Sequence, residues 1–172
     1  TALLLPTAAL AHTGGTSYLS LMRAGAAWQA QLDLPLPDAA SELALDADGD
    51  AALRWGEVLD AAPRIEAQLA RRLRLRTDAG DCAGRLAAEP ALVRREHGPH
   101  LRVALRFDCG APGSGSTVLD ATSWLAAVPD HAILVDGRAA GTDATLLAGS
   151  VSSLPLAPGS ASAMAGTAGR FF

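Results

Sequence analysis

Lysine is absent from this 172-residue chain, in which all 14 cationic residues are Arg and are outnumbered by 18 Asp and Glu residues. The net charge is −4 with neutral His. Proteins that bind nucleic acids gather Lys and Arg on one face to neutralise phosphates. A mildly acidic chain with scattered Arg offers no such face, so we expect no nucleic-acid partner.

Aromatic residues are also scarce, at 4% of the chain, although hydrophobic residues reach 49%. That hydrophobic content is enough for a packed core and argues against general disorder. The core should consist mainly of Ala, Leu and Val side chains. The length fits one domain with appended segments, because domains usually contain roughly 100–200 residues.

The apolar run at the N-terminus is too short to span a bilayer. It ends in Ala9-Leu10-Ala11, which fits a signal-peptidase site, so we predict that residues 1–11 are a signal-peptide remnant and that the exported chain begins at His12. A buried strand or helix is the alternative. A free α-amine on His12 would form, with its imidazole, a chelating pair for copper or nickel; otherwise His12 only follows the cleavage site.

Cysteine occurs twice, as Cys82 and Cys109, and neither belongs to a CxxC pair, which leaves little support for zinc or redox chemistry. In the cytosol two such residues would be free thiols, whereas in an oxidising compartment an even count favours a bridge. Because we expect export, we predict a Cys82–Cys109 disulfide.

Catalytic motifs are missing. The sequence has no GxSxG elbow, its Gly-rich stretches do not open helices after strands, and its histidines have no identifiable nucleophile. We therefore predict that the chain is not an enzyme; a secreted hydrolase would need an apolar pocket with convergent polar groups.

His97 and His100 could present two imidazoles to nickel, copper or zinc, or form a plain exposed turn, and His131 has no near partner in sequence.

Short stretches of alternating apolar and polar residues predict a mainly β fold, an antiparallel β-sandwich of immunoglobulin-like type over residues 12–156. Trp28, Ala30, Leu32, Leu34 and Leu36 should share one inward face. Residues 157–172 are mostly Ala, Gly and Ser, too small and polar to build a core, which predicts a linker to a membrane segment that the sequence lacks. We expect strands at 17–22, 28–36, 73–77, 91–96, 101–109 and 153–157. We also expect a hairpin within 131–150 that turns at Asp136-Gly137.

An inserted helix–EF-hand-like loop–helix is predicted at about 38–72. Asp38 should cap the first helix, and Pro63 should kink or restart the second. Between them, "DADGDAALRWGE" (46–57) has the ligand spacing of a calcium loop. The predicted ligands are the carboxylates of Asp46, Asp48, Asp50 and Glu57 and the backbone carbonyl of Ala52.

One feature of this loop leaves an alternative open. The sixth position, usually Gly, is Ala51, and a positive φ there should weaken calcium binding by roughly 5- to 30-fold. The alternative is a solvated acidic turn in which Asp50 favours the N-terminal dipole of the following helix.

The segments "SYLSL", "LALDADGD", "LRWGE" and "LRLRTDAGDC" resemble the extracytoplasmic N-terminal portion of HupE/UreJ-type membrane proteins over roughly residues 11–109, and "GRFF" resembles the entry to that family's first membrane helix. Gln29 replaces a family-like Asp, and Ala51 replaces the loop Gly. The resemblance implies a multi-helix protein linked to nickel or related metal transport for hydrogenase and urease maturation. The family's transport ligands are His and Asp within membrane helices, so none is assigned here.

On this basis we expect a non-catalytic domain at the periplasmic face of the bacterial inner membrane, carrying a structural calcium loop and partnered by its own C-terminal membrane domain. Nickel or copper would bind in addition only through the histidines. The alternative is a free-standing, secreted, calcium-stabilised adhesion or interaction module.

Overall fold

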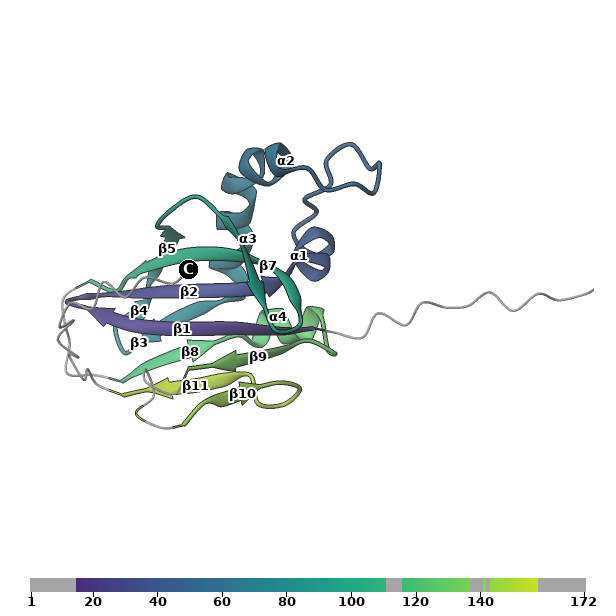
Figure 1. The fold of residues 1–172 in the computed structure, drawn as a ribbon. Helices are drawn as coiled ribbons and strands as arrows, with labels where there is room; N and C mark the ends of the chain where they lie inside the picture. Colours follow the sequence, from purple (N-terminus) through teal and green to yellow (C-terminus); the bar gives the residue numbers. More distant parts are fainter. Residues whose placement is uncertain (1–14, 111–115, 137–140, 142, 158–172) are drawn as a thin grey trace, which may run out of the picture.

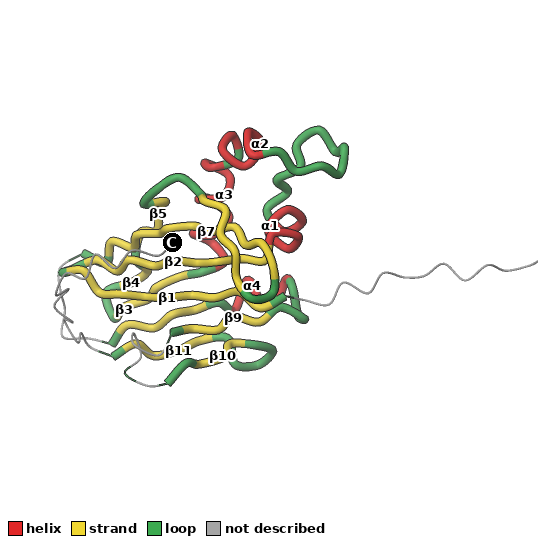
Figure 2. Tube along the Cα trace, viewed as in Figure 1, coloured by secondary structure: helices red, strands yellow, loops and turns green. Residues whose placement is uncertain are grey.

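The computed structural model describes residues 15–110, 116–136, 141 and 143–157, which form two β-sheets with a few short helices (Figures 1 and 2). This confirms the mainly β prediction. The strands are β1 Thr16–Ala24, β2 Ala27–Pro35, β3 Arg74–Thr77, β4 Gly80–Asp81, β5 Ala83–Leu86, β6 Ala91–Arg95, β7 Gly98–Asp108, β8 Thr117–Asp120, β9 Ala132–Val135, β10 Thr145–Leu147 and β11 Ser153–Leu156. The helices are α1 Leu36–Glu42, α2 Trp55–Asp60, α3 Ala62–Arg72 and α4 Thr122–Ala127.

The larger sheet has seven strands in the order β10-β9-β1-β2-β7-β5, with β6 also paired to β7. The predicted strands 17–22 and 28–36 correspond to β1 and β2, which pair antiparallel with Leu19 opposite Leu32. However, β1 and β9 run parallel, with Leu19 opposite Val135, so this sheet is mixed and the purely antiparallel prediction is wrong for it. The two strands are joined by most of the chain, and a long connection permits a parallel pair where a tight turn does not.

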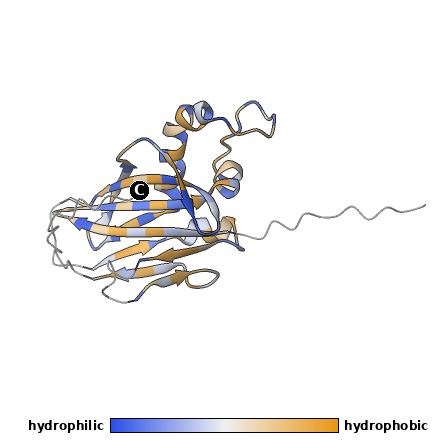
Figure 3. Ribbon diagram, in the orientation of Figure 1, coloured by the Kyte–Doolittle hydropathy of each residue, from blue (hydrophilic) through white to orange (hydrophobic). Residues whose placement is uncertain are grey.

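The smaller sheet is antiparallel, in the order β11-β8-β3-β4. Leu119 on β8 lies opposite Leu75 on one side and Leu154 on the other. Figure 3 shows hydrophobic and hydrophilic residues alternating along the strands, as expected for strands with one buried face. The buried side chains of both sheets, among them Leu32 and Leu119, belong to one hydrophobic core.

The inward face predicted for β2 is confirmed for four of its five residues, from Trp28 to Leu34. Leu36 was wrongly included, because β2 ends at Pro35 and Leu36 begins α1. Proline is tolerated in the first turn of a helix, which has no intrahelical partner for its N–H. Asp38 therefore lies in the first turn of α1 and does not cap it, so that prediction was also wrong.

The second predicted helix is divided into α2 and α3 at Ala61, two residues before Pro63, which confirms the expected restart. Ile65 and Leu69, four residues apart on α3, are fully buried. The Leu86 N–H of β5 donates to Oε2 of Glu66, which lies on α3, at 2.7 Å. The helices are thus attached to the edge of the larger sheet.

The predicted strands 73–77, 91–96, 101–109 and 153–157 correspond to β3, β6, β7 and β11, and β9 pairs antiparallel with β10 as the predicted hairpin requires. Two short strands beyond those predicted, β4 and β5, flank Cys82, and β7 begins at Gly98, three residues before the predicted start. Some predictions concern residues that the structure does not describe, namely residues 1–11, His12, Gly137 and residues 158–172.

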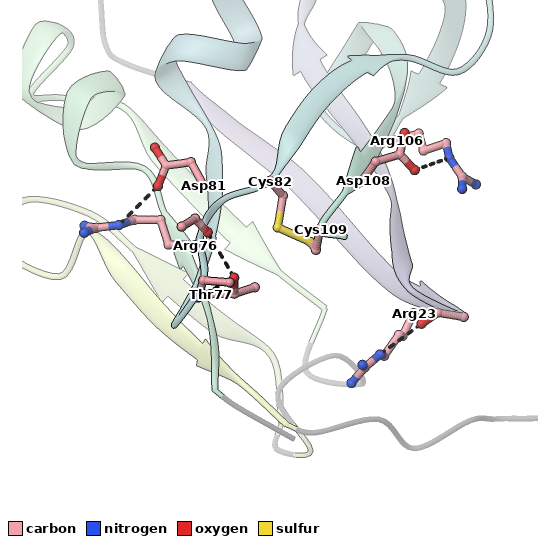
Figure 4. Close-up of a disulfide and its surroundings, with 11 residues drawn as sticks. Arg23, Arg76, Thr77, Asp81, Cys82, Arg106, Asp108 and Cys109 are labelled. Carbon is pink, nitrogen blue, oxygen red and sulfur yellow. Dashed lines mark hydrogen bonds and ion pairs between the residues drawn. A yellow bond between two sulfur atoms is a disulfide. The ribbon is translucent and has the colours of Figure 1, made fainter. Parts of the chain in front are cut away.

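The predicted disulfide is confirmed (Figure 4). The Cα atoms of Cys82 and Cys109 are 4.2 Å apart, just below the range of about 4.4–6.8 Å that is usual for disulfides. Cys82 lies between β4 and β5, where the chain passes from the smaller sheet to the larger one, and Cys109 directly follows β7. The bridge is consistent with an extracytoplasmic location. Within the described part of the chain, no helix is both long and apolar enough to cross a bilayer.

Candidate functional site

The acidic loop leads from α1 to α2, and Figure 1 shows this segment projecting away from the strands. Asp46, Asp48 and Asp50 each offer a carboxylate oxygen, and these three oxygens lie within 4.8 Å of one another. Asp48 and Asp50 are exposed, and Asp46 is half-buried. Three of the predicted calcium ligands are therefore gathered at the end of a projecting loop.

Backbone hydrogen bonds hold these carboxylates in position. Asp46 accepts from the N–H groups of Gly49 and Ala51 at 2.8 and 2.9 Å. Asp48 accepts from Asp50 at 3.1 Å, and Asp50 accepts from Ala52 at 2.9 Å. The loop thus curls around its own aspartates, which places them on the inner side of the turn.

Ala51 has a φ of 63°, in the left-handed region predicted for the sixth position of the loop. An L-residue with a Cβ is disfavoured there by about 1–2 kcal/mol. At this position the loop therefore has the left-handed conformation that the calcium-binding pattern requires, even though Ala51 is not the Gly that favours it.

Glu57, the predicted twelfth-position ligand, has a different role in this structure. Its Oε1 accepts from the N–H of Ala47 and its Oε2 from the N–H of Arg54, both at 2.8 Å. These backbone hydrogen bonds, that from Arg54 foremost, lower the pKa of Glu57 below its ordinary value. Glu57 caps α2 and does not join the group of three aspartates.

Arg54, at the ninth loop position, supplies positive charge to the aspartates. Its guanidinium donates to Asp48 Oδ2 at 3.2 Å and to Asp50 Oδ2. The hydrogen bond from Arg54 is the main cause of a pKa for Asp50 that lies below its ordinary value. The aspartates therefore have a protein cation beside them, with which an added metal ion would compete.

The two histidines proposed as a transition-metal pair have different environments. His97 is exposed between β6 and β7, whereas His100 is buried in β7, with its ring 5.7 Å from that of Tyr18. Neither belongs to a group of three or more potential metal ligands among the described residues.

A second group of potential ligands, which sequence reasoning missed, consists of Asp38, Glu42 and His131. Asp38 and His131 are buried, and the Glu42 side chain is 9% exposed. His131 Nδ1 lies 3.4 Å from Glu42 Oε1 and 3.7 Å from Asp38 Oδ2. The spacing of Asp38 and Glu42 on one predicted helix was a usable signal, but nothing in the sequence placed His131 beside them.

Several groups surround this buried cluster. Ser17 Oγ lies 2.9 Å from His131 Nε2, and the indole N–H of Trp124 donates to Glu42 Oε2 at 2.7 Å. The Trp124 ring also stacks on that of His131, with 5.2 Å between centroids. The backbone N–H of Gly15 donates to Asp38 Oδ2 at 3.0 Å. The cluster therefore joins α1, α4, β1 and the start of β9.

Ser17, His131 and Glu42 follow one another in the order of a serine hydrolase triad. Ser17 is fully buried within β1, so a substrate has no approach to its hydroxyl in this conformation. The arrangement supports a structural or metal-binding role better than nucleophilic catalysis. That the chain is not an enzyme stays a prediction.

No protein-family model matches the chain, and no curated protein shows significant similarity to it.

Proposed function

We propose that the chain is a non-catalytic, extracytoplasmic domain of a HupE/UreJ-like membrane protein associated with nickel or other metal transport, stabilised by calcium at its acidic loop. The observation that carries the calcium part is the convergence of Asp46, Asp48 and Asp50 between two helices. The Cys82–Cys109 bridge supports export. The periplasmic face of the inner membrane, and a C-terminal membrane domain as partner, follow from the sequence resemblance alone.

The affinity for calcium should be low. Hard cations prefer oxygen ligands, and three aspartates provide them, but Ala51 and Arg54 both work against binding. Extracellular calcium modules operate at Kd values of about 10⁻⁴–10⁻³ M, which tolerates such losses. Binding would also require Glu57 to exchange its backbone hydrogen bonds for the ion, unless water completes the coordination.

The test is the melting temperature of the chain with and without millimolar calcium. A ligand that binds only the folded state raises the melting temperature by mass action. Asp46→Ala should abolish the increase, whereas Asp60→Ala, which removes an exposed carboxylate of α2 outside the loop, should retain it. If the wild type and Asp46→Ala melt alike at every calcium concentration, the loop is only an acidic turn.

A second candidate, a free-standing secreted interaction module, is favoured by two exposed apolar side chains. Trp55 is 41% exposed and Leu59 is 37% exposed, and their spacing of four residues on α2 puts them on one face beside the acidic loop. Large exposed aromatic residues are enriched at protein interfaces. The reading frame after Phe172 distinguishes the candidates: apolar runs of roughly 20 residues support the membrane protein, and a stop codon supports the free module.

The immunoglobulin-like class of the sandwich also remains a proposal. Its support is the pair of sheets that share one hydrophobic core.

A further inference from the structure

We propose that Asp38, Glu42 and His131 bind one divalent transition-metal ion of the zinc and nickel class, at a site separate from the acidic loop. This site does not depend on the family membership proposed above. Its ligands come from α1 and from the residue that directly precedes β9.

Two elements bring these ligands together. Asp38 and Glu42 are four residues apart on α1, so their side chains project from the same side of the helix. His131 directly precedes β9, and the Ala132 N–H donates to the carbonyl of Gly15 at 3.2 Å. The N–H of that same Gly15 donates to Asp38. One residue at the start of β1 therefore holds both α1 and the start of β9.

The distances suit a small divalent ion. Zinc bonds to imidazole nitrogen and carboxylate oxygen of about 2.0–2.2 Å, at the tetrahedral angle, place two ligand atoms about 3.3–3.6 Å apart. In this structure His131 Nδ1 is 3.4 Å from Glu42 Oε1 and 3.7 Å from Asp38 Oδ2. Both distances are close to that range, and the ligand atoms of all three residues lie within 4.8 Å of one another.

Each ligand is also held by a group outside the set. Ser17 Oγ contacts Nε2 of His131, which orients the ring with Nδ1 toward the carboxylates. Trp124 donates to Oε2 of Glu42, and Oε1 is the atom nearest the imidazole. Such supporting hydrogen bonds fix ligand orientation in metal sites, and their loss typically weakens metal binding by about 10- to 100-fold.

The ligand chemistry selects the class of ion. Imidazole suits zinc, copper and nickel, whereas calcium and magnesium take oxygen ligands almost exclusively. The buried cluster combines one imidazole with two carboxylates, and the exposed loop offers carboxylates alone. The same helix–loop region would thus carry two sites for different ions. Without an ion, the alternative role of the cluster is a structural histidine held between two carboxylates.

The experiment is isothermal titration of the full chain, stripped with a chelator, with zinc alone and with nickel alone at neutral pH. We expect one ion per chain. Glu42→Gln and His131→Gln should each weaken zinc binding at least about 100-fold, and Trp124→Phe about 10- to 100-fold. The matched control replaces Asp46, Asp48 and Asp50 by Asn and should leave zinc binding unchanged. Loss of zinc binding in this control alone, or no binding by the wild type, overturns the proposal.

A second measurement on the wild type covers variants that fail to fold. X-ray absorption of the zinc-loaded chain should show nitrogen and oxygen ligands at about 2.0–2.2 Å that include imidazole. Nickel should quench Trp124 fluorescence, because this indole stacks on His131, and Trp55→Phe should retain the quenching. A coordination shell without imidazole, or quenching that disappears in Trp55→Phe, contradicts the site.

Discussion

Arg54 donates from its guanidinium to Oδ2 of Asp50, four residues before it in the acidic loop. The same guanidinium also reaches Asp48. Both partners are accessible to solvent, with 57% of the Arg54 side chain and 38% of the Asp50 side chain exposed. The loop therefore neutralises part of its own negative charge with a residue that an incoming calcium ion would displace.

Arg54→Gln should tighten calcium binding by about 2- to 5-fold, because exposed ion pairs are weak and only this competition is lost. Calorimetric titration with calcium at low ionic strength measures the change. Arg64→Gln is a suitable control, since Arg64 donates to the Ala44 carbonyl and to none of the three aspartates. Equal affinities in wild type and Arg54→Gln would mean that the ion does not enter at Asp48 and Asp50.

Ala51→Gly should raise the free energy of unfolding by about 1 kcal/mol without calcium. The folded loop already has Ala51 at a φ of 63°, so glycine relieves about 1–2 kcal/mol of strain and loses about 0.5–1 kcal/mol of chain entropy. Urea unfolding measures the difference. Ala44→Gly, at a φ of 50° outside the acidic residues, should stabilise the chain similarly.

The calcium affinity of Ala51→Gly shows whether the strain at residue 51 is present before calcium binds or arises when calcium binds. Since the left-handed conformation is present without the ion, the gain in affinity should be less than 5-fold, below the range expected from the sequence. A gain of 5- to 30-fold would instead mean that calcium binding imposes this conformation on a loop that is otherwise relaxed.

Asp33 forms ion pairs with Arg95 and Arg102 on the larger sheet. Asp33 on β2 is fully buried and accepts from Arg102 at 2.7 and 2.8 Å and from Arg95 at 2.7 Å. Burial raises the pKa of Asp33, but the hydrogen bonds and positive charges of these two residues outweigh it and hold the pKa below its ordinary value. The folded state therefore favours the ionised carboxylate.

Asp33→Asn should lower the free energy of unfolding at neutral pH by about 1–3 kcal/mol. This is less than for a fully buried pair, because both guanidinium groups are about a third exposed. The stabilisation is present above the unfolded pKa of about 4 and is lost as the pH falls below it, because the folded-state pKa is the lower one. Urea unfolding at pH 7 and pH 3 should show the difference between variant and wild type shrinking. A difference that is constant with pH would contradict the assignment.

Removing the disulfide should destabilise the chain by about 3–4 kcal/mol, from the entropy of closing a loop between residues 27 apart in sequence. Cys82→Ser with Cys109→Ser, compared with oxidised wild type in urea, measures this. Reduction of the wild type should have the same effect, and the double variant should not respond to a reductant. Two reactive thiols in the unfolded, unreduced wild type would show that the bridge is absent.

The sequence predicted the parts of this fold that depend on local pattern. Period-two alternation located β1, β2 and β7, because burial of one face fixes the phase of a strand. The β1–β9 pair could not be predicted, since nothing local specifies which distant strand completes a sheet edge. His131 was missed for the same reason: its cluster with Asp38 and Glu42 exists only because of that long-range pairing.

The Cys82–Cys109 bridge and the Asp38–Glu42–His131 cluster lie at opposite ends of the same strands. The bridge is beside the end of β7, which is opposite Ala27 at the start of β2, whereas α1 begins where β2 ends. At one end, therefore, the disulfide holds the segment in which the chain passes from the smaller sheet to the larger one. At the other end, polar contacts join α1, α4, β1 and the start of β9. Under mechanical load or brief thermal opening, the two sheets should separate first at the end that only polar contacts hold. They should stay together longest at the end that contains the disulfide.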